Sequence, residues 1–330
     1  MRKEKINWLS ILQGWTMLWV VIGHSPLGTP GEGPVWENRL YDIAYSFHMA
    51  LFMLISGYLF YRTRIAADGW SYPRMLKDKA LRLLLPMAVF TLVAFAMKML
   101  FPGEMSRDSS LSARALLEAF IMPYNGPLRE MWFIMSLMWM FALMPLWRAL
   151  LSNRYAMIIA FLALAVLHYF HPDTEILNIG RTLKYAVWFY LGLLVSQYDA
   201  SVAFADRYKL PLLVAGVAIY LLGIHSDEAL TALGGIVTSF SLAFMLDKVW
   251  PKAFSTFRDY TYQIFLMGIF AQVAVRILYR HLPMPYILAW LICVLAGIYV
   301  PVAISLLLKK IDFNPLLLCI GMKGTKTGKR

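Results

Sequence analysis

Charged residues are scarce in this sequence. They make up 15% of the 330 residues, whereas hydrophobic residues make up 60%. A typical soluble domain carries about 25% charged and about 45–50% apolar residues. Because so few charges cannot cover the surface of a water-soluble fold of this length, the composition excludes an ordinary soluble domain and indicates a membrane protein.

Cysteine is nearly absent, and no internal repeat is visible. The two cysteines, Cys293 and Cys319, provide neither a disulfide framework nor a metal cluster. His168 and His171 have a spacing found in metal sites, but no third helical ligand accompanies them, so we predict no metal. The missing repeat counts against a transporter built from inverted repeats.

Apolar runs of about 20 residues have the length that crosses a bilayer as a helix. Ten such segments predict an all-α integral membrane protein of about ten transmembrane helices. They are Ile6–Ser25, Tyr41–Tyr61, Leu81–Phe101, Glu130–Leu150, Tyr155–Phe170, Thr182–Gln197, Leu210–His225, Leu230–Leu246, Tyr260–His281 and Tyr286–Leu308. We expect one transmembrane domain over residues 1–310 and a basic cytoplasmic tail over residues 311–330.

The lysines and arginines are distributed unevenly over the connections between these segments. With the N-terminus inside, most of them fall on the cytoplasmic side, so we predict that both termini are cytoplasmic. This orientation signal accounts for the net charge of +12, and the absence of a recognition module argues against nucleic-acid binding. The stretch from Lys323 to Arg330 is expected to lie along anionic lipid headgroups.

Histidines at membrane depth are candidates for chemistry, because ionisable residues are costly there. His24 ends the first segment next to Gly23, and Gln13 lies about three turns earlier on the same helix face. The pair indicates a pore or cleft lined by that face. The alternatives are an interfacial histidine facing headgroups and a glutamine bonded to a neighbouring helix.

The second segment carries His48 near its outer end and Ser56 with Gly57 in its inner half. For His48, a buried polar contact and a role in the site both remain open. Small residues such as Ser56 and Gly57 permit close helix packing, and Ser56 alternatively lines the pore or the acceptor site.

Glu130 and Trp132 lie at the outer end of the fourth segment, at the predicted level of His24. A carboxylate near a histidine raises its basicity and orients its ring. The helix dipole also favours a solvated Glu130 at a helix start. Trp132 is either an interface anchor or a stacking surface for a sugar.

Lys79 and Arg82 lie three residues apart at the entrance to the third segment, so they share a face at the predicted cytoplasmic mouth. Two cations in this position are suited to the phosphates of a nucleotide-like donor. The alternative is that both residues only contribute to the orientation signal.

Several of these stretches together resemble the acyltransferase-3 family of membrane acyltransferases. The stretches that carry the resemblance are Leu12–Gly14, Val20–His24, Phe47–Phe52, Ser56–Leu59, Lys79–Pro86, Trp132–Phe133, Trp188–Gly192 and Asp259–Leu266. The Gly-His form is most similar to the fucose 4-O-acetylase-like branch, and the resemblance covers nearly the whole chain. The sequence departs from the family pattern at Gln13, where Arg or Lys is usual, and at Gly268, where histidine is frequent.

The resemblance implies transfer of an acyl group, usually acetyl from acetyl-CoA as co-substrate, onto envelope carbohydrate at the bacterial inner (plasma) membrane. It implies that His24 is essential and that Lys79 and Arg82 serve the donor. Attack by a sugar hydroxyl needs a general base, so we expect His24 in that role, oriented by Glu130 or His48.

The expected function is therefore O-acylation, with acetyl the expected group, of a glycan or glycolipid by a multi-pass membrane enzyme. Two alternatives belong to other classes, namely a glycolipid transporter or flippase and an inactive interaction subunit. A repeat and intramembrane charges on several midplane helices would indicate the transporter. The sequence specifies neither the acceptor hydroxyl nor the oligomeric state.

Overall fold

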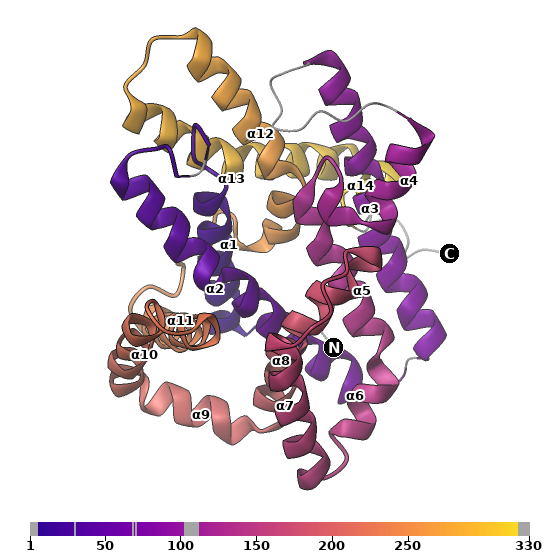
Figure 1. The fold of residues 1–330 in the computed structure, drawn as a ribbon, viewed down its shortest axis with the longest axis vertical. Helices are drawn as coiled ribbons and strands as arrows, with labels where there is room; N and C mark the ends of the chain where they lie inside the picture. The colour runs from indigo at the N-terminus through magenta and orange to yellow at the C-terminus, as the bar shows by residue number, and fades with distance from the viewer. Residues whose placement is uncertain (1–5, 30, 68, 70, 102–111, 323–330) are drawn as a thin grey trace. The chain divides into compact units, whose positions relative to one another are not determined.

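The computed structural model describes residues 6–29, 31–67, 69, 71–101 and 112–322. Every regular element within these ranges is a helix (Figure 1). The helices belong to two compact units, each assembled from two stretches of chain. The first unit comprises Met1–Ile55 and Tyr198–Leu307, and the second comprises Ser56–Gln197 and Leu308–Arg330.

The first unit is organised around its N-terminal helix. Its elements are α1 (Asn7–Gly23), most of α2 (Val35–Phe60), α9 (Asp199–Arg207), α10 (Lys209–Gly223), α11 (Glu228–Val249), η5 (Arg258–Tyr260), α12 (Thr261–His281) and most of α13 (Tyr286–Ile311). Helix α1 packs against α11 and α12, and α10 runs along α11 (Figure 1). Met17, Val20 and Val21 of α1 share a buried core with residues of α12 and α13. The end of α1 is therefore fixed by packing.

The second unit has an aromatic core. Its elements are the end of α2, the π-helix η1 (Tyr61–Ile65), α3 (Tyr72–Leu100), α4 (Ala113–Ile121), η2 (Pro123–Asn125), η3 (Arg129–Met131), α5 (Trp132–Ala142), α6 (Met144–Leu150), α7 (Arg154–Tyr169), η4 (Ile176–Asn178), α8 (Ile179–Gln197) and α14 (Asn314–Cys319). Phe189 of α8 is fully buried. Phe60, Phe141 and Trp147 surround it at ring-centroid distances of 5.9, 6.2 and 5.9 Å.

Small residues allow close helix contact in this unit, as the sequence predicts for Gly57. A Cβ atom added at Gly57 would collide with the backbone carbonyl of Phe189, so α2 and α8 approach each other closely there. The packing prediction is therefore confirmed at Gly57. Ser56 is half-buried next to it, and its role in lining a pore or acceptor site stays a prediction.

We expect Gly57→Ala to destabilise the protein, because the added methyl group forces α2 away from α8. Overpacking of this kind typically costs about 1–3 kcal/mol. Thermal unfolding of the purified protein should show a melting temperature several degrees lower. Gly28→Ala is the matched control, because a Cβ atom at Gly28 has no neighbour within 4 Å. Equal melting temperatures for the two variants would contradict the close contact.

Five helices are long and apolar enough to cross a membrane within the described part of the chain. They are Val35–Ile65, Tyr72–Leu100, Glu228–Val249, Arg258–His281 and Tyr286–Ile311. A sixth is possible if the bent pair Arg129–Ala142 and Met144–Leu150, with an angle of 59°, forms one span. All ten predicted segments fall on helices, but several are short, so the count of ten and the side of the termini stay predictions.

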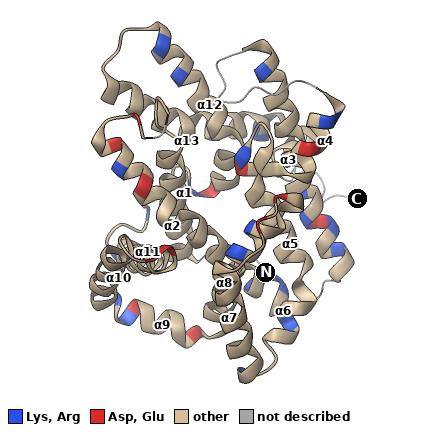
Figure 2. Ribbon diagram, viewed as in Figure 1, with Lys and Arg blue, Asp and Glu red and all other residues tan. Residues whose placement is uncertain are grey.

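Charged side chains are sparse along most of the helices, as Figure 2 shows, although the first part of α3 carries several. In α10, α11 and α13 they are confined to the helix ends. This distribution fits apolar helix interiors in a membrane. The predicted division into residues 1–310 and 311–330 stays a prediction. The Lys323–Arg330 stretch lies outside the described residues.

Candidate functional site

His24 follows the last residue of α1 and caps its C-terminal end, with φ −101° and ψ 6°. Its ring nitrogen Nδ1 lies 2.8 Å from the carbonyl oxygen of Val20. Because a carbonyl oxygen only accepts hydrogen bonds, Nδ1 must be the protonated nitrogen of the neutral ring. Nε2 therefore carries the lone pair and is the nitrogen that can take a proton.

Tyr45 of α2 lies directly against this imidazole. Its hydroxyl oxygen is 3.4 Å from His24 Nε2, and the two ring centroids are 5.7 Å apart. The same tyrosine ring packs edge-on against His48, at a centroid distance of 5.1 Å. Tyr45 is 44% exposed. One exposed aromatic residue thus contacts both histidines.

His48 is almost completely buried, with 1% of its surface exposed. Its Nδ1 bonds to the carbonyl oxygen of Ala44, one turn earlier in α2. The structure thus gives His48 the buried polar contact that the sequence left open, and it places His48 next to the Tyr45 ring. A direct role for His48 in orienting His24 stays a prediction.

Two polar residues of α12 hold the end of α1. Gln272 is 2% exposed, and its Nε2 donates to the carbonyl of Val21 at 2.9 Å and to Ser25 Oγ at 2.8 Å. Arg276 donates to the carbonyl of His24 at 3.3 Å. These contacts fix the backbone on both sides of the histidine. Their signal in the sequence is a pair of polar residues one turn apart in an apolar helix.

Gly23 and Gly268 explain the close helix contacts around this end. A Cβ atom on Gly23 would lie 3.1 Å from Cβ of Ala44 and 3.2 Å from the Tyr45 ring. A Cβ atom on Gly268 of α12 would lie 2.8 Å from the carbonyl oxygen of Gly297 in α13. A histidine at position 268, as in the family pattern, therefore does not fit with these helix positions.

Gln13 lies in the middle of α1 and is half-buried. Because the regular helix ends at Gly23, the periodicity that places Gln13 and His24 on one face stops one residue before His24. The role of Gln13 in lining a cleft stays a prediction.

The predicted donor cations belong to the second unit. Both lie inside α3, which begins earlier than predicted, at Tyr72. The Lys79 ammonium lies 3.9 Å from the ring centroid of Phe141 and 5.8 Å from that of Phe60. Its charged neighbours are Arg82, which is exposed, and Arg64 in the π-helix. Nε of Arg64 is buried and has no hydrogen-bond partner among the described residues. The sequence did not single out Arg64.

Glu130 and Trp132 also belong to the second unit. Glu130 lies in the η3 turn and is half-buried. Trp132 begins α5, is 9% exposed, and packs against Tyr185 at a centroid distance of 5.2 Å. Since His24 lies in the first unit, its pairing with Glu130 stays a prediction. So does the role of Trp132 in stacking on a sugar.

Comparison with known proteins identifies the family. The acyltransferase-3 family model, described as an acyltransferase domain, matches residues 6–306. Over 185 residues the chain is 34% identical to nodulation protein NolL of Mesorhizobium japonicum, a match that covers 54% of this chain and 44% of that protein. No solved structure matches. Because the family model spans nearly all of the helical chain, the protein belongs to the acyltransferase-3 family of membrane acyltransferases.

Proposed function

We propose that this protein transfers acetyl from acetyl-CoA to a hydroxyl of a cell-envelope glycan or glycolipid in the bacterial inner membrane. The observation that carries the proposal is the hydrogen bond from His24 Nδ1 to the Val20 carbonyl. That bond leaves Nε2 as the basic nitrogen, on the side of the partly exposed Tyr45. A positioned imidazole that can take a proton is the usual general base for acyl transfer to an alcohol.

The proposed reaction has His24 as its general base. His24 Nε2 removes the proton of the acceptor hydroxyl as its oxygen forms a bond to the thioester carbonyl carbon. The tetrahedral intermediate then breaks its carbon–sulfur bond, and the departing CoA thiolate takes the proton from the imidazolium. The products are an O-acetyl glycan and free CoA, and His24 returns to its neutral form. The Val20 carbonyl accepts a hydrogen bond from Nδ1–H of the neutral ring and of the imidazolium, so it stabilises the imidazolium when it forms.

The donor side of the proposal uses the cations of the second unit. Lys79, Arg82 and Arg64 form a group of like charges, which an anionic ligand would relieve. Arginine and lysine are the usual ligands of phosphate groups. We assign the phosphates of CoA to this group. The buried Nε of Arg64 supports the assignment, because a bound phosphate would supply its missing acceptor.

The proposal is tested with purified protein in lipid nanodiscs, radiolabelled acetyl-CoA and a panel of envelope glycans. We expect label to appear in at least one glycan as an alkali-labile ester and CoA to be released in equal amount. Movement of intact glycolipid between leaflets without loss of acetyl-CoA would support a flippase instead. Absence of both activities would support an inactive interaction subunit.

Gln272→Leu should slow transfer while leaving the donor KM unchanged. The variant removes both hydrogen bonds to the end of α1 but nearly conserves volume, so His24 loses its fixed position. Misplacement of a catalytic group by about 1 Å can cost about 100-fold in rate. Steady-state kinetics would show the loss in kcat. Ser305→Ala is the control, because it removes a buried hydroxyl that bonds within α13. Equal kcat values in the two variants would show that Gln272 does not position His24.

A further inference from the structure

In and beside a strained turn of the second unit lie buried polar atoms that have no hydrogen-bond partner among the described residues. Leu177 and Asn178 of η4 have positive φ angles of 50° and 57°. This left-handed backbone conformation is uncommon for residues other than glycine. Asn178 is fully buried. Its Nδ2 donates to the carbonyl of Trp132 at 2.9 Å and to Ser136 Oγ at 2.6 Å. Its Oδ1 is buried without a partner among the described residues.

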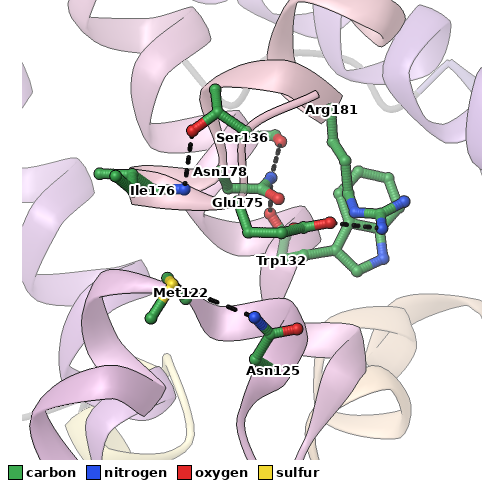
Figure 3. Close-up of polar contacts among 9 residues, drawn as sticks. Met122, Asn125, Trp132, Ser136, Glu175, Ile176, Asn178 and Arg181 are labelled. Carbon is green, nitrogen blue, oxygen red and sulfur yellow. Dashed lines mark hydrogen bonds and ion pairs between the residues drawn. The ribbon is translucent and has the colours of Figure 1, made fainter. Parts of the chain in front are cut away.

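Beside the turn, an arginine and a glutamate make only some of the hydrogen bonds that their side chains can form. Arg181 donates from one terminal nitrogen to Glu175 Oε1 at 2.9 Å, and its guanidinium lies 3.4 Å from the ring centroid of Tyr124. Nε of Arg181 and Oε2 of Glu175 are buried and lack partners within the described residues. Figure 3 shows Glu175, Asn178 and Arg181 gathered beside Trp132.

The three open atoms form a set of one donor and two acceptors. A buried polar atom without a partner is destabilising, so a strained turn that collects three of them indicates a ligand that completes their hydrogen bonds. Sugar hydroxyls both donate and accept, and therefore match this mixed set. A phosphate is disfavoured, because Glu175 would repel it.

The ion pair is the partly exposed side of this cluster. The side chains of Arg181 and Glu175 are 29% and 27% exposed. Rotation of Arg181 would uncover the ring of Tyr124, and sugars pack their apolar faces on such rings. Arg129, which is exposed, lies 5.0 Å from the same ring and would border the bound sugar.

We propose that Glu175, Asn178 and Arg181 form a subsite for a hydroxyl-rich sugar ring of the acceptor, with Tyr124 as its aromatic wall. The inference rests on the proposed function, since it states where the acceptor glycan is held. It assigns these residues to binding and leaves the chemistry with His24.

The test is saturation-transfer NMR on the full-length protein in nanodiscs, with the methyl glycosides of glucose, galactose and mannose as probes. We expect transfer to the ring protons of at least one glycoside. Glu175→Gln and Arg181→Lys should each raise the apparent Kd of that glycoside by about tenfold, because each variant loses about one charge-assisted hydrogen bond. Arg181→Lys keeps the ion pair with Glu175, so its fold should be preserved.

Glu118→Gln is the matched control. It removes the same charge from another ion pair of the second unit. In that pair Arg114 Nε lies 2.7 Å from Glu118 Oε1, and both side chains are exposed. This variant should bind the glycoside as the parent does. No saturation transfer in the parent, or equal Kd values in all variants, would overturn the subsite. Because this readout needs no acetyl-CoA, a failure of acetyl transfer with glycoside binding intact would instead contradict the proposed function.

Discussion

His24→Gln is expected to abolish acetyl transfer in a protein that is folded and inserted. Glutamine keeps the approximate size and hydrogen-bonding capacity of histidine, but it cannot take a proton from the acceptor hydroxyl. Loss of a positioned general base typically costs about 10²–10⁴-fold in rate. The measurement is the initial rate of radiolabelled acetyl transfer, together with the melting temperature of the purified variant.

His225→Gln is the matched control, because His225 is an exposed histidine in the turn after α10 of the same unit. It should retain the parental rate. If His24→Gln keeps more than about a tenth of the parental rate, His24 is a structural contact of the α1 end, since a removed base costs far more. His48 and Glu130 would then be the leading candidates for the base.

The second large effect is expected at the donor cations. Lys79→Met combined with Arg82→Gln should raise the KM for acetyl-CoA by at least about tenfold, because each cation makes charge-assisted contacts to phosphate. The KM for the acceptor should change little. Methionine keeps the packing of the Lys79 stem against Phe141, so the loss of charge is separated from a loss of stability. The parent should also bind the donor more weakly at high salt.

Two exposed lysines, Lys248 in the last turn of α11 and Lys252 after that helix, provide the control. Lys248→Met combined with Lys252→Gln removes the same number of charges from a connection predicted to face the cytoplasm. Its donor KM should equal that of the parent. An unchanged donor KM in the Lys79 and Arg82 double variant would contradict donor binding by these residues and would indicate that they only contribute to the orientation signal.

The sequence predicted the helices well because long apolar runs have few other stable conformations in a membrane. Nine of the ten predicted segments lie on one helix each, whereas Glu130–Leu150 covers η3, α5 and α6, with a bend of 59°. The boundaries were less accurate where polar residues continue a helix. Helix α2 begins at Val35, before the predicted Tyr41, and α3 begins at Tyr72, before the predicted Leu81. A hydrophobicity pattern does not reveal such extensions, because a helix can continue through polar residues beyond the end of its apolar run.

The surroundings of the site could be predicted only in part. His24 and the Lys79–Arg82 pair stood out because ionisable residues in or beside apolar segments are unusual. Tyr45 did not stand out. Gln272 and Arg276 are polar residues one turn apart in an apolar helix, but their contacts with the end of α1 depend on tertiary packing. The Val20 carbonyl as the partner of Nδ1 depends on how the chain leaves α1. Asn178 could not be predicted from the sequence, because a hydrophobicity pattern shows neither its left-handed backbone conformation nor its burial.

The role of His24 as the catalytic base is tested most directly by an experiment that separates the chemical step from donor binding. The rate of acetyl transfer is measured at rising acetyl-CoA concentration for the parent, for His24→Gln and for the Lys79 and Arg82 double variant. We expect the double variant to approach the parental rate at saturating donor, whereas His24→Gln stays inactive at every concentration. Recovery of His24→Gln at high donor concentration would contradict the assignment of His24 as the catalytic base.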